Sequence, residues 1–244
     1  MKFKFLSLIL ISSLFSCDTK TQKSMSELPN APLAKQIPKN LTIHDDVRVD
    51  EFYWLNDREN PEVIDYLNKE NDYYNTHTAH TKDFQKSLFE EMKSRIKEDD
   101  SSVPYKYNGY WYITKFKKGK DYPIYIRKKE SIDASEELLF DCNEMAKNHS
   151  YFRLVGLNVS PNNNMVSYAT DTTGRRQYKL QIKDLKTNKV FEEEIYNTTG
   201  GSTWANDNKT LFYTLKDETT LRSEAIYKHL LNTDPKLDKL IYEE

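Results

Sequence analysis

A short phrase that occurs twice constrains the fold of this chain more than any other feature. The first copy runs from Ser160 to Tyr168, and the second runs from Ala205 to Tyr213, 45 positions later. In each copy a polar turn rich in Asn leads into an apolar and aromatic run, which is typical of a tight bend between two strands. A repeat of roughly 40–50 residues is the length of one four-stranded blade of a β-propeller. The phrase therefore predicts propeller blades.

The sequence around the two copies repeats with nearly the same period. Alternating apolar side chains predict a strand after each copy, and a second polar turn recurs 44 positions apart, from Asn188 to Asn232. A third strand-rich unit, in which the pattern is less regular, precedes the two copies of the phrase. We predict a mainly β fold, a partial propeller of about three blades, over residues 105–150, 151–196 and 197–244. A blade cannot bury both of its faces alone, so these three require further neighbours.

Composition allows such a fold and argues against one class of partner. With 37% hydrophobic and 13% aromatic residues, the 244-residue chain can build a β core. Its 17 tyrosines and 11 phenylalanines are expected in that core, because aromatic residues pack well on pleated strands. The net charge of −2 offers no attraction for phosphate backbones, so nucleic acid is not an expected partner.

The first 17 residues have the pattern of an export signal. A basic start is followed by an apolar run, Phe5 to Phe15, which is too short to span a bilayer. The run ends at Leu14-Phe15-Ser16-Cys17, which resembles a bacterial lipobox with Cys17 as the lipidated residue. The alternative is an ordinary signal peptide with an incidental cysteine. We expect an exported protein, in the bacterial periplasm or at the outer membrane, attached to the membrane through a lipid anchor, with residues 18–30 as a tether.

Residues 31–104 are predicted to form an extended and helical segment ahead of the propeller. Three consecutive aromatic residues, Phe52 to Trp54, suggest an extended stretch held against another surface. Asn60-Pro61 is typical of a helix start, because a capping side chain precedes proline at the first helical position. Apolar residues then recur at helical spacing and predict one or two amphipathic helices over about 61–97.

The stretch from Arg48 to Leu55, followed by Pro61-Glu62-Val63, resembles the start of the prolyl oligopeptidase family, in particular its oligopeptidase B (protease II) branch. The resemblance extends over about 31–244 and includes five further strings: Glu90 to Ile96, Asp99 to Tyr105, Tyr122 to Tyr125, Arg175 to Tyr178 and Thr198 to Gly201. It implies a serine peptidase in which a seven-bladed propeller caps an α/β-hydrolase domain and the N-terminal segment packs on that domain. It also implies cleavage of short peptides after Arg or Lys.

The catalytic residues of such an enzyme are not expected within these residues. The string nearest to a Gly-x-Ser-x-Gly nucleophile elbow is Gly200-Gly201-Ser202-Thr203-Trp204, in which Trp204 stands where the last Gly belongs. We interpret the two glycines as the start of the third blade, where backbone must approach backbone, and not Ser202 as a nucleophile. The α/β-hydrolase domain is then expected beyond Glu244, and the chain alone should be inactive. The alternative is a non-enzymatic propeller lipoprotein that binds a protein or ligand.

Other candidate residues have simpler explanations, and no metal or cofactor is expected. His77 and His80 share a helix face and could form half of a zinc site, but a solvated face explains them better. Cys142 is expected to be a half-buried small residue, and Glu192 to Glu194 an exposed outer strand or turn.

The loop from Asp171 to Arg176 is the remaining candidate site. A Gly turn places Arg175 and Arg176 at the tip of a hairpin. Either the loop is only a solvated turn, or one of these guanidinium groups bonds carboxylates across the propeller–hydrolase interface, a role that suits the forked donors of Arg.

Overall fold

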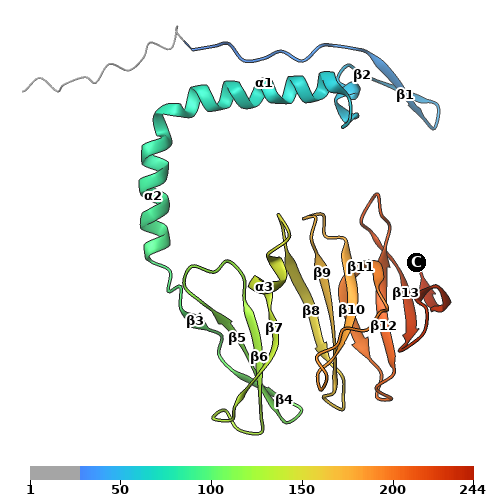
Figure 1. Cartoon of the computed structure of the whole chain (residues 1–244). Helices are drawn as coiled ribbons and strands as arrows, with labels where there is room; N and C mark the ends of the chain where they lie inside the picture. Colours follow the sequence, from blue (N-terminus) through green and yellow to red (C-terminus); the bar gives the residue numbers. More distant parts are fainter. Residues whose placement is uncertain (1–27) are drawn as a thin grey trace, which may run out of the picture. The chain divides into compact units, whose positions relative to one another are not determined.

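The computed structural model of the chain describes residues 28–244 (Figure 1). The predicted signal, residues 1–17 with Cys17, lies outside the described residues. The described residues divide into two compact units, with the boundary between Arg95 and Ile96. Within the described part, no helix combines the length and the apolar character needed to cross a bilayer.

The first unit contains a hairpin and two helices. Strands β1 (Lys39–Ile43) and β2 (Asp46–Asp50) pair in antiparallel fashion. Helix α1 spans Pro61–Thr78, and α2 spans Lys82–Ser94, with the short 3-10 helix η3 (Ala79–Thr81) between them. The predicted helix start is confirmed, because the Asn60 side chain accepts a hydrogen bond from the Glu62 amide at 2.9 Å. Val63 is the only buried side chain of α1, and α2 has none.

The aromatic stretch in this unit is not extended, which corrects that expectation. Tyr53 and Trp54 lie in a 3-10 turn, η2 (Tyr53–Asn56). The turn forms because the Asp50 carboxylate accepts a hydrogen bond from the Phe52 amide at 2.9 Å and reverses the chain. Trp54 then donates from Nε1 to the Lys35 carbonyl at 2.8 Å and packs edge-on against Tyr66 of α1. The aromatic residues therefore fasten the chain to its own first helix.

The second unit is built of antiparallel sheets, which confirms the predicted mainly β fold and partial propeller (Figure 1). We call its three successive parts blades 1, 2 and 3. The strands of blade 1 are β3 (Asp100–Ser101), β4 (Tyr105–Tyr107), β5 (Tyr110–Phe116), β6 (Ile124–Lys129) and β7 (Glu136–Asp141). Both β3 and β4 pair with β5, so strand pairing starts at Asp100. The short helix α3 (Cys142–Ala146) leads on to blade 2.

Blades 2 and 3 form one seven-stranded sheet. Its strands are β8 (Arg153–Val159), β9 (Met165–Asp171), β10 (Tyr178–Asp184), β11 (Ile195–Trp204), β12 (Thr210–Lys216), β13 (Ser223–Leu230) and β14 (Lys239–Glu243). The two blades share β11, whose first half pairs with β10 and whose second half pairs with β12. The outer part of blade 2, residues 190–194, makes only an isolated bridge at Val190 instead of the expected strand.

The backbone crosses from blade 2 to blade 3 where two glycines meet. Gly156 of β8 and Gly200 of β11 have φ values of 64° and 90°. A Cβ added at Gly156 would lie 1.7 Å from the carbonyl oxygen of Gly200. The expected approach of backbone to backbone therefore holds for Gly200, since no side chain fits between these strands. It does not hold for Gly201, where an added Cβ meets nothing within 4 Å.

Asparagines with positive φ recur along the backbone at the same spacing as the sequence repeat. Asn163 and Asn208 occupy equivalent turns of the repeated phrase with φ of 62° and 58°, and Asn188 and Asn232 occupy the second pair of turns with φ of 59° and 64°. Asn tolerates this conformation better than other non-Gly residues do. The turn asparagines also link the blades, because Asn208 accepts a hydrogen bond at Oδ1 from the Asn162 amide at 2.7 Å.

The core lies on both faces of β9, in which all seven residues are buried. One face of β9 belongs to an apolar cluster shared with blade 1, where Tyr168 packs on Phe140 with ring centroids 4.5 Å apart. The opposite face belongs to a second cluster shared with blade 3, in which Met165 and Ala169 meet Leu211. Successive side chains of β9 point to opposite faces of the strand, so one set packs against blade 1 and the other against blade 3. Blade 2, in the middle, is therefore packed on both sides.

Candidate functional site

The loop between β9 and β10 is organised around one buried carboxylate. Oδ1 of Asp171 accepts hydrogen bonds from the amides of Thr173 and Gly174 at 2.8 and 3.0 Å, and from the Thr173 hydroxyl at 2.9 Å. Oδ2 accepts one from the Arg176 amide at 2.7 Å. Burial of Asp171 disfavours its charge and is the largest single effect, but the hydrogen bonds together hold its pKa below the usual value. The ionised carboxylate therefore fixes the backbone of the whole loop.

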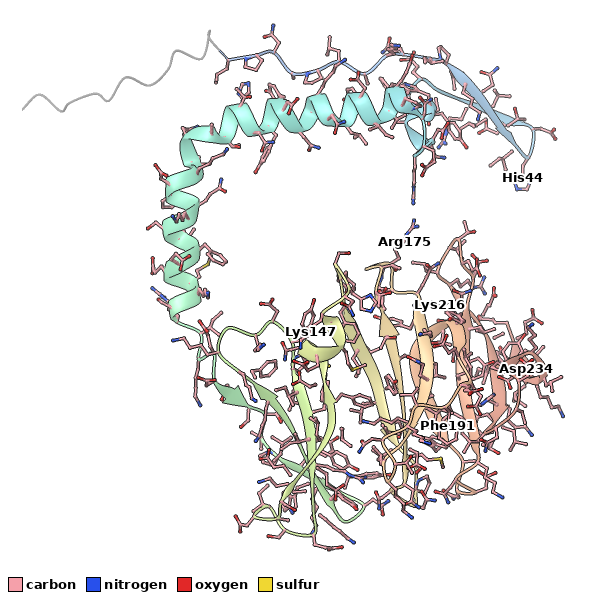
Figure 2. The ribbon with its side chains drawn as sticks, in the orientation of Figure 1. His44, Lys147, Arg175, Phe191, Lys216 and Asp234 are labelled. Carbon is pink, nitrogen blue, oxygen red and sulfur yellow. The ribbon has the colours of Figure 1, made fainter. Side chains whose placement is uncertain are left out.

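The two arginines stand at the tip of this loop. Both residues are exposed, and neither side chain forms a hydrogen bond or ion pair with any residue of the described range 28–244. Figure 2 shows the Arg175 side chain projecting from the end of blade 2. Arg176 lies in the left-handed region with φ of 58°, and its carbonyl accepts a hydrogen bond from Lys216 Nζ at 2.9 Å. A rigid loop thus presents free forked donors, an arrangement that can bind carboxylates or phosphates.

Neither Ser202 nor Cys142 has the surroundings of a catalytic nucleophile. Ser202 lies within β11, not at a strand-to-helix turn, and donates its hydroxyl hydrogen to Ser167 Oγ at 2.8 Å. Cys142 is 1% exposed, so it is fully buried rather than half-buried. Burial, together with the charge of Asp141, raises the pKa of the Cys142 thiol to about 12, so the thiolate is not formed near neutral pH.

Each of the two helix histidines has one ring nitrogen within hydrogen-bonding distance of a backbone carbonyl oxygen. His77 Nε2 lies 2.9 Å from the Pro29 carbonyl oxygen, and His80 Nδ1 lies 3.0 Å from the carbonyl oxygen of His77. Over residues 28–244, no three His, Cys, Asp or Glu side chains come together as a metal site.

The three glutamates between β10 and β11 lie outside regular strand structure and have different surroundings. Glu194 pairs with Lys179 at 2.7 Å, which is the main reason that its pKa is lowered, whereas Glu192 is exposed.

The match to a known domain covers most of the chain. Residues 32–244 match the model of the prolyl oligopeptidase N-terminal β-propeller domain. The chain belongs to the prolyl oligopeptidase family. The resemblance of the N-terminal segment and of the blade strings is thereby confirmed.

Similar members of the prolyl oligopeptidase family are peptidases. The chain is 39% identical over 218 residues to dipeptidyl aminopeptidase BI of Pseudoxanthomonas mexicana, covering 82% of this chain and 30% of the relative. It is 33% identical over 220 residues to protease 2 of Moraxella lacunata, covering 87% and 32%. The solved oligopeptidase B of Leishmania major superposes with a TM-score of 0.80 at 28% identity, covering 88% of this chain and 33% of that one. The chain thus spans about a third of the length of the relatives that it matches.

In this prolyl oligopeptidase family member the sequence predicts that the two arginines stand at a hairpin tip, but it does not single out Asp171, the residue that positions them. Asp171 begins a polar loop, and an Asp followed by Thr and Gly is a signal for side-chain capping of a turn. A buried trio in blade 3 was missed altogether. Asp238 accepts hydrogen bonds from Tyr213 at 2.8 Å and lies 2.7 Å from His229. These three residues are far apart in sequence, so no local pattern could have joined them.

Proposed function

We propose that this chain is the propeller part of a serine oligopeptidase that cleaves short peptides after Arg or Lys. The observation that carries the proposal is the likeness to protease 2 and to oligopeptidase B over nearly nine-tenths of the chain. In this proposal an α/β-hydrolase domain supplies the serine nucleophile and its acid–base partners. The ring of blades limits access, so that only short peptides reach the reacting serine.

The proposed contribution of the candidate site is an interdomain contact. The Asp171 loop holds Arg175 and Arg176 in place before any partner arrives, so little conformational entropy of the loop is lost on docking. Carboxylates of the hydrolase domain would then accept from the guanidinium groups. In the full-length enzyme, Arg175→Ala and Arg176→Ala should lower kcat/KM by weakening domain closure. Unchanged kcat/KM and unchanged closure in both variants would refute the contact.

The specificity is tested with pairs of peptides on the full-length protein. Peptides with a blocked amino terminus and an internal Arg or Lys should be cleaved after the basic residue, and neutral replacements such as citrulline should not. The likeness to a dipeptidyl aminopeptidase supports a second candidate, the release of dipeptides from a free amino terminus. Cleavage confined to peptides with a free amino terminus would favour that second activity. The 18–244 chain alone should hydrolyse neither kind, and hydrolysis blocked by a serine-directed inhibitor would contradict this.

We also propose that the protein is exported and attached to a membrane through Cys17. The support is the basic and apolar leader that ends at this cysteine. In the producing cell, Cys17→Ala should move the protein from the membrane fraction to the soluble fraction and abolish labelling by a radioactive fatty acid. Labelling that persists in Cys17→Ala would refute lipidation at this residue. Sequencing the gene past codon 244 separates the peptidase from a non-enzymatic propeller lipoprotein, since only the former continues into a Gly-x-Ser-x-Gly string.

A further inference from the structure

A buried histidine joins a segment of blade 2 to blade 3. His229 lies in β13 and is fully buried. Its ring approaches two stretches of chain, residues 190–194 after β10 and the connection from β13 to β14. Figure 2 labels one residue from each stretch, Phe191 and Asp234. Residues 190–194 form only an isolated bridge, at Val190, so their position depends on side-chain contacts.

Two buried carboxylates flank the ring of His229. Its Nδ1 lies 2.7 Å from Oδ1 of Asp238, and its Nε2 lies 4.0 Å from Oε1 of Glu193. The side chains of Asp238 and Glu193 are only 2% and 10% exposed. Neither carboxylate forms an ion pair with a Lys or Arg of residues 28–244. Buried charges in proteins are normally paired, and His229 is the basic group that both carboxylates share.

The other polar groups around the ring carry no positive charge. The Tyr213 hydroxyl donates to Oδ2 of Asp238 at 2.8 Å. Burial and this hydrogen bond raise the pKa of Tyr213, so the hydroxyl keeps its proton. Tyr227 stacks on the Tyr213 ring, and the Asn232 amide donates to Oε1 of Glu193. Among the described residues, the groups that contact either carboxylate therefore include no cation other than the histidine ring.

The second ring nitrogen shows which form of His229 fits this site. An ionised Asp238 can only accept, so Nδ1 carries a proton. In the neutral ring, Nε2 is then an acceptor that faces the Glu193 carboxylate and has no partner among the described residues. In the imidazolium form, Nε2 also carries a proton and can donate to Glu193 in a charge-assisted hydrogen bond. Oε1 of Glu193 has a second lone pair for this bond beside the one that the Asn232 amide uses.

We propose that His229 is a pH-sensitive latch between blades 2 and 3. The imidazolium form donates to Asp238 of blade 3 and to Glu193 of segment 190–194, and so fastens this segment to blade 3. As the pH rises, Nε2 loses its proton and changes from donor to acceptor, and the contact with Glu193 opens. Histidine changes charge between about pH 5 and pH 8, so the latch is closed at the acidic end of this range and open at the alkaline end.

The test follows the ring and the segment by NMR of the ¹⁵N-labelled full chain, from about pH 8 to about pH 5.5. Both ring nitrogens of His229 should carry protons at the acidic end, and Nε2 should lose its proton toward the alkaline end. The Asn232 amide, which donates to Glu193, should exchange at least about tenfold more slowly at the acidic end, after correction for the intrinsic effect of pH on exchange. An Nε2 that stays unprotonated throughout, or an Asn232 protection that does not change, would overturn the proposal.

Two neighbouring variants separate the latch from a general charge effect. In Glu193→Gln, the new amide can donate to the unprotonated Nε2, so the protection of Asn232 should no longer depend on pH. Glu192 is exposed and has no hydrogen-bond or ion-pair partner within residues 28–244, so Glu192→Gln should keep the wild-type response. The proposal is refuted if Glu193→Gln keeps that response or if Glu192→Gln loses it. The ring measurement on the wild-type protein needs neither variant and decides the matter if one fails to fold.

Discussion

Two equivalent loops, one in blade 2 and one in blade 3, have the same backbone hydrogen-bonding pattern but carry different side chains. The loop after β9 begins at Asp171, and the loop after β12 begins at Asp217. Each aspartate accepts hydrogen bonds from the amides two and three residues further on. Each loop also places a non-Gly residue in the left-handed region, Arg176 with φ of 58° and Leu221 with φ of 60°. The repeat therefore determines the path of the chain, and the side chains on that path are free to differ.

The difference lies in what surrounds each loop. Asp171 is 1% exposed and also binds the Arg176 amide, whereas Asp217 is only partly buried. The loop of blade 2 leaves its guanidinium groups unengaged within residues 28–244, while Arg222 in blade 3 lies 3.9 Å from Glu244. Blade 2 is packed against blade 1 on one face and blade 3 on the other, so the strands that carry its loop are better buried. A preorganised loop with free arginines is suited to recognition, and the loop of blade 3 is not.

The largest expected effect comes from the contact that joins the two blades. Gly156→Ala should destabilise the fold by about 3 kcal/mol or more, because its Cβ would overlap the Gly200 carbonyl and the residue needs a positive φ. Urea unfolding followed by circular dichroism measures the loss. Gly201→Ala is the matched control, since an added Cβ there meets nothing within 4 Å, and should change stability by less than about 0.5 kcal/mol. Similar losses in both variants would show that the blades are not joined at this point.

Two tyrosines that stand 45 positions apart in the repeat, Tyr168 and Tyr213, differ in the partners of their hydroxyl groups. The Tyr213 hydroxyl donates to the buried carboxylate of Asp238, so Tyr213→Phe should cost about 1–3 kcal/mol by leaving that carboxylate with one donor fewer. Burial raises the pKa of Tyr168 to about 12, but its hydroxyl has no hydrogen-bond partner within residues 28–244. Tyr168→Phe should therefore be nearly neutral by the same urea measurement. A larger loss for Tyr168→Phe would contradict the role given to the blade 3 trio.

The contrast between the blades also shows what the sequence could predict. The period, the strands and the turn asparagines are local patterns, and they predicted the blades and their turns. The shared strand β11 and the meeting of Gly156 with Gly200 depend on how neighbouring blades approach, which no single repeat encodes. The arginine tip was predicted because Gly174 marks a turn. The contacts of Asp238 with Tyr213 and His229 are not predictable in this way, since the three residues come from separate elements of blade 3.

Acid stability should separate the two aspartate loops. Hydrogen bonds lower the pKa of Asp171 in spite of its burial, and hydrogen bonds from Thr220 lower that of Asp217. A carboxyl group with a lowered folded-state pKa contributes stability above its unfolded pKa of about 4, and this contribution disappears as the pH falls through the folded value. Asp171→Asn should remove about 1–2 kcal/mol at pH 7 and flatten the loss of stability below about pH 4. Urea unfolding at a series of pH values measures both effects.

Asp217→Asn is the paired variant and should change both quantities less, because Asp217 is more exposed and makes no bond equivalent to that with the Arg176 amide. An equal flattening in the two variants would show that burial does not distinguish the loops.

The smallest expected effect is common to both loops and tests their shared backbone. Arg176 and Leu221 adopt a left-handed conformation that costs a non-Gly residue about 1 kcal/mol. Replacement by Gly relieves this strain but adds freedom to the unfolded chain, so Arg176→Gly and Leu221→Gly should each raise stability by about 0.5 kcal/mol. Differential scanning calorimetry can resolve such a gain in Tm. Gly at Thr172, which precedes the left-handed residue in the same loop, should only destabilise, and a gain there would mean that strain at Arg176 is not the cause.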